Sequence, residues 1–290
     1  MITGSIVALV TPMKMDGSVD WQALEQLIEN HIAAGTDAIG VVGTTGESAT
    51  LTVPEHCEVI TFAVEKANGR IPIVAGTGSN STHEAIELTV SAAETGADAS
   101  LLVTPYYNRP TQEGLYQHFC KVAEAVNLPI ILYNVPGRTA VDMSNETVIR
   151  LSEVSNIVAL KDATGDVERG ADLISRLPET FAVYSGDDAT ALELMRRGAK
   201  GNISVTANIA PAQMAELCRL ALAGSFEQAD RVNQRLSHLN RALFLEPNPI
   251  PIKWAMAEHA MIQAGIRLPL TPLSENHHAA IRHAIKQAEL

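Results

Sequence analysis

Eight short apolar segments recur along the chain, and a helical pattern follows each of them. They lie near residues 5–10, 38–42, 71–75, 99–103, 130–134, 157–161, 181–185 and 200–204. Almost every residue in these segments is apolar, which indicates strands that are buried on both faces, as in a parallel sheet covered by helices. The alternation of strand and helix therefore predicts an α/β fold with a parallel sheet.

Three of these strands are entered in the same way, from a helix that ends at a glycine. The junctions read AAGTDAIGVV at 33–42, ETGADASLLV at 94–103 and RRGAKGNISV at 196–205. Glycine readily adopts the left-handed conformation that commonly ends a helix. Before the first junction, apolar side chains recur at helical spacing between Asp20, a suitable N-cap, and Gly35. The repeated junction indicates repeats of one strand–helix unit.

Eight such units over about 220 residues fit a (β/α)8 TIM barrel better than an open doubly wound sheet. The Rossmann-type alternative requires a GxGxxG turn after the first strand, where this chain has TPMKMDG. After Gly224 the strand pattern stops, and three helical segments follow, separated near EPNPIP (246–251) and RLPLTP (267–272). We therefore expect a barrel over residues 1–224 and a C-terminal helical domain, a three-helix appendage, over residues 225–290.

Charge and composition restrict the partners of the chain. Its 33 acidic and 21 basic residues give a net charge of −12, which argues against nucleic acid or an anionic membrane, because phosphate contacts need clustered Lys and Arg. The three cysteines are far apart and lack a CxxC pair, which argues against a disulfide framework or a zinc site. The N-terminal stretch does not read as a signal peptide, and no apolar run approaches the ~18 residues of a spanning helix. We expect a soluble cytoplasmic protein.

The active site of such a barrel lies at the carboxyl ends of the strands. Polar segments follow the second to seventh strands: GTTGES (43–48), GTGSN (76–80), TPYYNRP (104–110), YNVPGRT (133–139), KDATGD (161–166) and SGDD (185–188). We expect the chemistry of the chain to be among these residues.

Lys161 is unusual because it continues a buried strand. Alternation places Ile157, Ala159 and Lys161 on one face of the strand. Asp162 lies on the opposite face with the intervening residues, so it is not an obvious ion-pair partner for Lys161. Apolar surroundings lower the pKa of an amine from about 10.4, and a neutral amine can attack a carbonyl. The alternative is a lysine that extends to water at the barrel mouth.

Each of the other polar residues at this end of the barrel has two possible roles, one functional and one structural. Tyr133, near the end of the neighbouring strand, can serve as a general acid and base or can pack in the core. Thr44 and Thr45 lie in a glycine-containing turn suited to a carboxylate or phosphate, or in an ordinary turn. Arg138 can hold a carboxylate through its planar fork, or can be a surface arginine. The combination is more specific than any single residue.

This combination resembles the dihydrodipicolinate synthase family, also called the 4-hydroxy-tetrahydrodipicolinate synthases, of the pyruvate-dependent Schiff-base aldolases. The similar segments span the chain: GSIVALVTPM, VGTTGESATL, VAGTGSNST, LLVTPYYNRPTQEGLYQHF, ILYNVPGRT, KDATGD, YSGDDAT, GNISVTAN and EPNPIPIKWA. Several of them are shared with the wider superfamily, whereas TPYYNRPTQEGLYQHF and YNVPGRT are typical of the synthases. The resemblance implies condensation of pyruvate with L-aspartate 4-semialdehyde, the committed step of lysine biosynthesis through diaminopimelate.

The resemblance also implies the catalytic residues. Lys161 would form the imine with pyruvate, and Tyr133 would be the acid and base. Thr44 and Tyr107 would complete a proton relay, with this tyrosine donated by the neighbouring subunit of a homotetramer, a dimer of dimers. No metal or organic cofactor is implied, because the protonated imine itself is the electron sink. Asp162 replaces the glutamate of many relatives and should not alter the chemistry, since it faces away.

Substrate-binding residues follow from the same resemblance. Thr45 and nearby loop amides would hold the pyruvate carboxylate, Gly186 and Ile203 would line the pocket, and Arg138 would bind the carboxylate of the semialdehyde. Within the superfamily, the alternatives are N-acetylneuraminate lyase and the 2-keto-3-deoxy-sugar-acid aldolases, which typically lack an arginine at this position. A non-catalytic barrel that binds a keto acid is the alternative from a different class.

Feedback inhibition by L-lysine is a further implication of the resemblance. In inhibited relatives lysine binds in the dimer cleft, and the matching positions here are Ser48, Ala49, His56, Gly78, Asn80, Glu84 and Tyr106. Glu84 can pair with an ammonium group of lysine, and Asn80 and Tyr106 can bind its carboxylate. Val53 replaces the histidine of some regulated members and removes a polar contact. We therefore expect partial inhibition.

Overall fold

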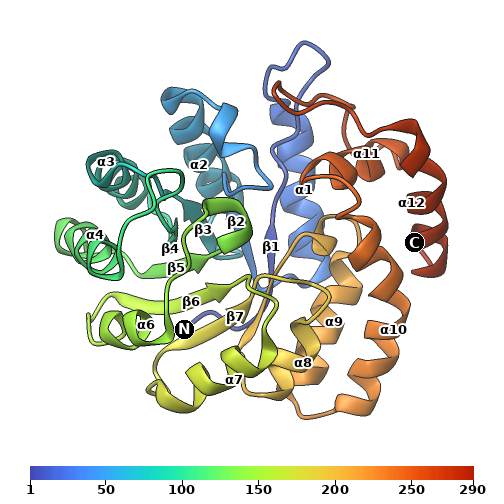
Figure 1. Ribbon diagram of the computed structural model, residues 1–290. Helices are drawn as coiled ribbons and strands as arrows, with labels where there is room; N and C mark the ends of the chain where they lie inside the picture. Colours follow the sequence, from blue (N-terminus) through green and yellow to red (C-terminus); the bar gives the residue numbers. More distant parts are fainter.

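The computed structural model describes residues 1–290, and its eight parallel strands form a closed barrel (Figure 1). The strands are β1 (Gly4–Ala8), β2 (Ala38–Val41), β3 (Ile73–Gly76), β4 (Ala99–Val103), β5 (Ile130–Asn134), β6 (Ile157–Asp162), β7 (Ala182–Ser185) and β8 (Gly201–Ser204). Each strand pairs with the next in sequence, and β8 closes the barrel on β1. All eight begin and end within two residues of the predicted segments, so the TIM-barrel prediction is confirmed.

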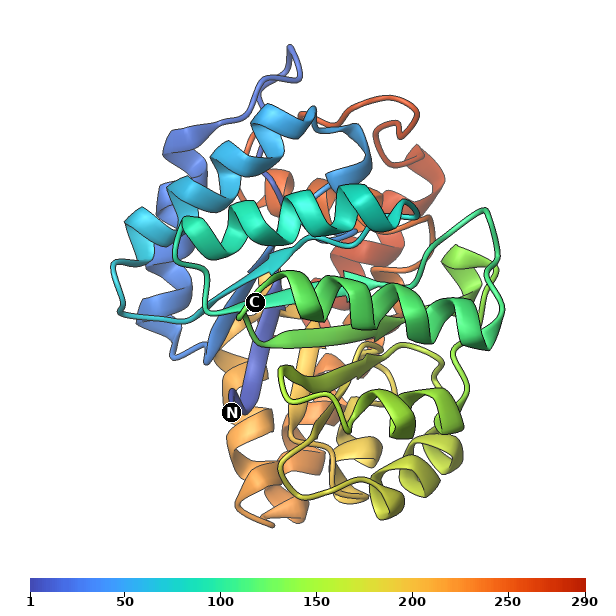
Figure 2. The ribbon, with the colours of Figure 1, turned by 90° about the vertical axis from the view of Figure 1, so that its left-hand side faces the viewer.

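Helices surround the barrel, and Figure 2 shows α3 and α4 in front of the strands. The helices that follow β1 to β8 are α1 (Trp21–Ala34), α2 (Val53–Ala67), α3 (Thr82–Glu94), α4 (Gln112–Ala125), α5 (Pro136–Thr139), α6 (Asn145–Leu151), α7 (Val167–Arg176), α8 (Ala191–Arg196) and α9 (Pro211–Leu222), with 3-10 turns η1 (Ser48–Thr50) and η2 (Thr206–Asn208). The Asp20 side chain caps α1 by accepting a hydrogen bond from the Ala23 amide, and Gly35 ends the helix at φ 79°. Both predicted ends of this helix are confirmed.

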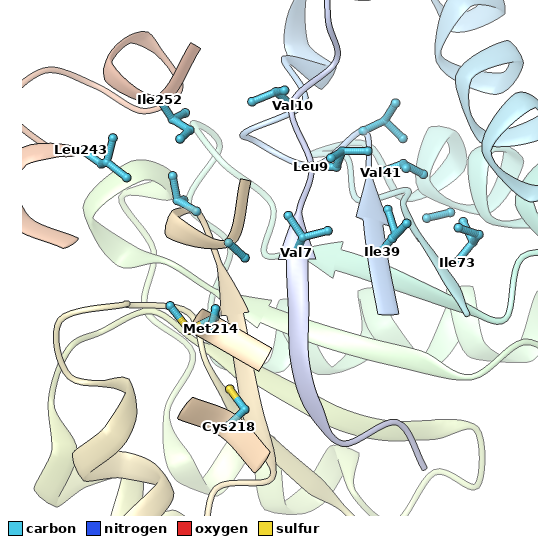
Figure 3. Packing of buried hydrophobic residues seen from close by; sticks show 14 of the residues in the cluster. Val7, Leu9, Val10, Ile39, Val41, Ile73, Met214, Cys218, Leu243 and Ile252 are labelled. Carbon is cyan, nitrogen blue, oxygen red and sulfur yellow. The ribbon is translucent and has the colours of Figure 1, made fainter. Parts of the chain in front are cut away.

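Apolar side chains fill two layers, one inside the barrel and one between the strands and the helices. Ile6, Leu101 and Ile131 are buried in the inner layer. Val7 and Ile39 point outward from neighbouring strands into the outer layer (Figure 3). Because both faces of every strand are covered, the strands need apolar residues at almost every position.

β6 departs from the regular alternation that we expected. Ile130 of β5 pairs with Ile157, and the next residue of β5 pairs with Ala159, so Val158 is an extra residue in β6. Ile157 consequently lies in the outer layer, whereas Val158 packs against the inner one. Our placement of Ile157 on the same face as Lys161 was therefore wrong. The regular pairing that resumes at Ala159 leaves Lys161 facing the interior, as predicted.

Three helices follow the barrel and lie together on one side of it (Figure 1). They are α10 (Phe226–Ala242), α11 (Ile250–Glu258) and α12 (Glu275–Gln287), which matches the three predicted segments. Leu243 and Ile252 of this part belong to the same apolar cluster as Leu9 and Val10 just after β1 (Figure 3). No helix of the structure combines the length and apolarity that crossing a membrane requires.

Candidate active site

A cavity of about 360 Å³ lies at the carboxyl ends of the strands. Seven of the predicted site residues line it: Thr44, Thr45, Tyr133, Arg138, Lys161, Gly186 and Ile203. They come from β5, β6 and β8 and from the segments after β2, β5 and β7. The barrel thus brings together residues that are far apart in the sequence, at the end where such folds carry their active sites.

Lys161 lies in this cavity with its side chain directed at Tyr133 of the neighbouring strand. The two residues are register partners, and the Lys161 Nζ atom is 4.3 Å from the centroid of the Tyr133 ring. Lys161 is only 6% exposed and forms no ion pair, unlike the buried Lys253, which pairs with Glu47. A buried amine without a protein partner is available for a ligand that enters the cavity.

Asp162 is directed away from the cavity, as predicted. Its carboxylate accepts a hydrogen bond from the Thr164 amide at 3.0 Å. Burial raises the pKa of the Asp162 carboxyl, although the hydrogen bonds from Thr164 oppose this shift. The carboxylate therefore belongs to the layer behind the strand, and Lys161 has no counter-ion beside it in the sequence.

Gly186 leaves the room that the Lys161 side chain occupies. A Cβ atom at residue 186 would lie 2.8 Å from the Cε atom of Lys161 and 2.9 Å from the Cβ atom of Ala163. Both distances are well below an ordinary carbon–carbon contact of about 3.5–4.0 Å. A side chain at residue 186 would therefore overlap the Lys161 side chain in the position that it has in this structure.

The segment after β2 folds into a compact turn that carries Thr44 and Thr45. The Glu47 amide donates to the Thr44 carbonyl at 3.1 Å, and the Ser48 amide donates to the Gly43 carbonyl at 3.3 Å. Thr45 is 2% exposed, and its Oγ1 atom accepts a hydrogen bond from the Asn248 side chain at 2.9 Å. The Thr45 side chain is thereby held at the cavity wall, and the turn places Thr44 beside it in the same wall.

Arg138 lies on the short helix α5 at the mouth of the cavity. Its Nη2 atom donates to the Asn248 carbonyl at 3.1 Å, which is the only hydrogen bond of this side chain within the chain. The rest of the guanidinium is exposed and free to bind an anion at the entrance.

Asn248 and Phe244 also line the cavity and were missed by our sequence reasoning, whereas Asp187 belongs to the SGDD segment that we expected there without assigning it a role. Asn248 contacts both Thr45 and Arg138, and its Oδ1 atom is buried without a hydrogen-bond partner. The available signal was the EPNPIPIKWA segment, which we counted among the segments that resemble the family but placed in the helical appendage, without a role in the site. No pattern in the sequence indicates that this segment reaches the barrel mouth.

Tyr107 is the one predicted catalytic residue that the single chain does not bring into the cavity. Its side chain is 89% exposed, and its backbone adopts φ 73° in the loop between β4 and α4. The Tyr107 amide donates to the Thr139 carbonyl, which fixes the loop beside α5. Within one chain, therefore, Tyr107 contributes nothing to the lining around Lys161.

A second cavity, of about 370 Å³, lies beside the first. Six of the seven residues predicted to bind lysine line it: Ser48, Ala49, His56, Gly78, Glu84 and Tyr106. Asn80 is not in the lining, but its side chain donates to the Tyr106 carbonyl at 3.2 Å. Val53 lines the cavity and is 54% exposed. Six of the predicted lysine-binding residues thus line this one cavity, which is called the second cavity below.

His56 illustrates the polarity of the second cavity. Its Nε2 atom is 2.8 Å from the Gly76 carbonyl oxygen, so this nitrogen carries the proton. Burial lowers the pKa of His56, while the Gly76 carbonyl and the Glu84 carboxylate oppose the shift. A neutral His56 leaves Glu84 as the charged side chain that a cationic ligand would meet.

The comparisons with known proteins extend over the whole chain. The model of the dihydrodipicolinate synthetase family matches residues 1–288. The 4-hydroxy-tetrahydrodipicolinate synthase of Marinobacter nauticus is 61% identical over 287 residues, which cover 99% of this chain and 98% of the relative.

No group of three or more His, Cys, Asp or Glu side chains in the structure is arranged to hold a metal ion.

Two solved structures are similar to this chain over its full length. The chloride-inhibited dihydrodipicolinate synthase of Acinetobacter baumannii, complexed with pyruvate, is 60% identical and has a TM-score of 0.99, covering 100% of this chain and 99% of that one. The synthase of Cyanidioschyzon merolae with lysine bound is 41% identical, with a TM-score of 0.96, and covers 100% of this chain and 99% of that one. The similarity therefore includes the C-terminal helices as well as the barrel.

Proposed function

The chain belongs to the dihydrodipicolinate synthetase family, and we propose that Lys161 carries the family's reaction by forming a Schiff base with pyruvate. The reaction is the condensation of pyruvate with L-aspartate 4-semialdehyde, catalysed by a lyase of the class I aldolase type. It is the committed step of lysine biosynthesis through diaminopimelate. The observation that supports the role of Lys161 most directly is its buried, unpaired amine beside the Tyr133 ring.

Covalent catalysis begins at the Lys161 amine. The neutral amine attacks C2 of pyruvate, and loss of one water gives the imine. Removal of a proton from the pyruvate methyl group gives an enamine, whose carbon forms a bond to the aldehyde carbon of the second substrate. The amino group of that substrate then attacks C2, which closes the ring and releases Lys161. Each turnover therefore joins the two substrates with loss of one water and needs no oxidant.

The surrounding residues divide the binding and the proton transfers. Tyr133, whose ring centroid is 4.3 Å from Lys161 Nζ, would give and take protons next to the imine carbon. Thr44 lies in the turn behind it and would pass protons to Tyr107 of a neighbouring subunit. Thr45 and the turn amides bind the pyruvate carboxylate, with Gly186 and Ile203 in the wall around it. Arg138 binds the carboxylate of the semialdehyde at the entrance.

Trapping with borohydride tests the covalent step. Borohydride reduction in the presence of pyruvate should add one reduced pyruvate unit to the protein, and peptide mass spectrometry should find it on Lys161. A keto-acid-binding barrel without catalysis would give no adduct. A coupled assay with the semialdehyde then separates this activity from sugar-acid cleavage, for which N-acetylneuraminate is the control substrate.

Assembly of the site between subunits has its own test. We propose that the chain forms a homotetramer, a dimer of dimers, in which Tyr107 enters the partner's cavity. Its exposed position on the β4–α4 loop supports this arrangement. In hybrids of Tyr107→Phe and Lys161→Arg subunits, one of the two sites in a dimer would contain both native residues. Mixing the two inactive variants should therefore restore activity, and no recovery in verified hybrids would contradict the shared site.

The second cavity is the proposed site for feedback inhibition by L-lysine. Glu84 offers a carboxylate to an ammonium group, and Tyr106 and Asn80 lie at its border. Titration of L-lysine into the coupled assay should show partial inhibition, and Glu84→Gln should weaken it without changing uninhibited turnover. The absence of both inhibition and a heat of binding at millimolar lysine would contradict the assignment.

A further inference from the structure

The most deeply buried ion pair of the chain lies outside the catalytic cavity and joins the C-terminal helices to the barrel. It is formed by Lys253 of α11 and Glu47, whose side chains are 3% and 0% exposed. The side chains of all the other ion pairs are at least 18% exposed. This pair therefore differs in kind from the surface ion pairs of the molecule.

Every oxygen of the buried carboxylate has a partner. Glu47 Oε1 is hydrogen-bonded to Lys253 Nζ, and Glu47 Oε2 accepts from the Arg267 amide at 3.1 Å. Lys253 also donates to the Thr11 carbonyl at 3.1 Å, next to the end of β1. Burial lowers the pKa of Lys253, while the adjacent Glu47 opposes this shift. Both carboxylate oxygens of Glu47 are thus satisfied by groups of the same chain, and Lys253 is bound to Glu47 and to the Thr11 carbonyl.

Fold stability alone does not account for this pair. Removing two charges from water carries a large desolvation penalty, and apolar residues of similar volume often stabilise a fold equally well or better. Ile252, beside Lys253, already anchors α11 in the apolar cluster that includes Val10 (Figure 3). What an ion pair adds to such packing is a directional constraint on the position of the carboxylate.

The constrained position belongs to the turn that carries the pyruvate-binding threonines. Glu47 adopts φ 55°, a left-handed conformation that is unfavourable for a residue with a side chain. From this position its amide closes the turn onto the Thr44 carbonyl. Thr45 is held from the same side by Asn248, five residues before Lys253. Two contacts from one short C-terminal segment thus hold the turn at two points.

We propose that Lys253 is a positioning residue for the pyruvate site, which acts by fixing Glu47 and through it the turn with Thr44 and Thr45. The C-terminal helices are then part of the binding machinery for the first substrate, although Lys253 does not line the cavity. The inference rests on the proposed function, because the turn matters for catalysis only where it binds pyruvate.

The decisive variant removes both charges together. Lys253→Met alone leaves Glu47 buried without its cation and can prevent folding. The double variant Glu47→Gln with Lys253→Met leaves no uncompensated charge and retains an acceptor for the Arg267 amide. Glu258→Gln is the matched control, because Glu258 lies on the same helix and pairs with exposed Arg282 instead.

Four measurements separate positioning from a structural role: chemical denaturation, steady-state kinetics, borohydride trapping and hydrogen exchange. In the double variant we expect a wild-type midpoint of chemical denaturation. We expect a roughly 10-fold or larger rise in the pyruvate KM and in the pyruvate concentration that gives half-maximal borohydride trapping, because small displacements of binding groups are costly. The KM of the semialdehyde should change little. Amide hydrogens of residues 43–50 should exchange faster, and Glu258→Gln should resemble the wild type in every measurement.

Each other outcome decides against the proposal. A double variant with wild-type stability and wild-type pyruvate KM would show that the pair does not position the turn. A double variant that does not fold would make the pair a determinant of the fold instead. Failure of the proposed function is recognised separately, because the wild-type protein would then trap no pyruvate while hydrogen exchange would still report the order of the turn.

Discussion

Replacing Gly186 by alanine should damage catalysis while leaving the fold intact. The added Cβ atom would lie 2.8 Å from the Cε atom of Lys161. Relief of this overlap moves the lysine by about 0.7–1.2 Å, to an ordinary contact of about 3.5–4.0 Å. A displacement of this size at a reacting group can cost about 100-fold in rate, equivalent to about 3 kcal/mol in the activation free energy. We therefore expect imine formation with pyruvate to slow by about 100-fold.

The assay is rapid-quench borohydride trapping with saturating pyruvate, followed by mass spectrometry. Gly137→Ala is the control, because a Cβ atom there would meet nothing within 4 Å and the residue lies next to Arg138 at the same cavity. The control should trap pyruvate at the wild-type rate, and denaturation should show that both variants remain folded. Wild-type trapping kinetics in folded Gly186→Ala would refute the argument that the space at residue 186 positions the amine.

Three further predictions follow from individual side chains. Lys161→Arg keeps the charge but should abolish both borohydride trapping and turnover, because a guanidinium stays protonated; near-wild-type turnover would contradict the assignment. Arg138→Ala should lower kcat/KM for the semialdehyde roughly 30- to 1000-fold and leave pyruvate trapping intact; equal losses for both substrates would contradict its role at the entrance. Burial lowers the pKa of His31 from 6.5 to about 4 in the folded protein. The unfolded chain therefore binds a proton at His31 more readily, and the free energy of unfolding decreases as the pH falls from about 6.5 towards 4. The variant His31→Gln can still form a hydrogen bond to Thr36. Between pH 7 and pH 5, its free energy of unfolding, measured with urea, should fall by about 2 kcal/mol less than that of the wild type. An identical pH dependence in the two proteins would exclude this contribution.

The sequence predicted the barrel well because its strands are short, apolar and separated by recognisable helix ends. Gly35, for example, marks the end of α1 directly, since its left-handed conformation favours glycine. The extra residue in β6 was not predicted, because Val158 and Ile157 are equally apolar and alternation alone cannot reveal an irregular register. Asn248 was missed for a different reason. Its role arises from a contact with Thr45 across 203 positions of the sequence, and local patterns carry no information about such a contact.

The location of these long-range contacts explains why the two cavities need not be independent. Thr44, Val135, Arg138 and Asn248 line both cavities. The turn from Gly43 to Ser48 has one end in the wall of the active site and the other in the wall of the second cavity. A ligand in the second cavity would therefore contact the same turn that we propose binds pyruvate. Coupling between the cavities requires only that the turn have two conformations and that such a ligand bind them with different affinities. Lys253 and Asn248 hold the turn from the C-terminal segment. Their contacts limit how far the turn can move between its two conformations.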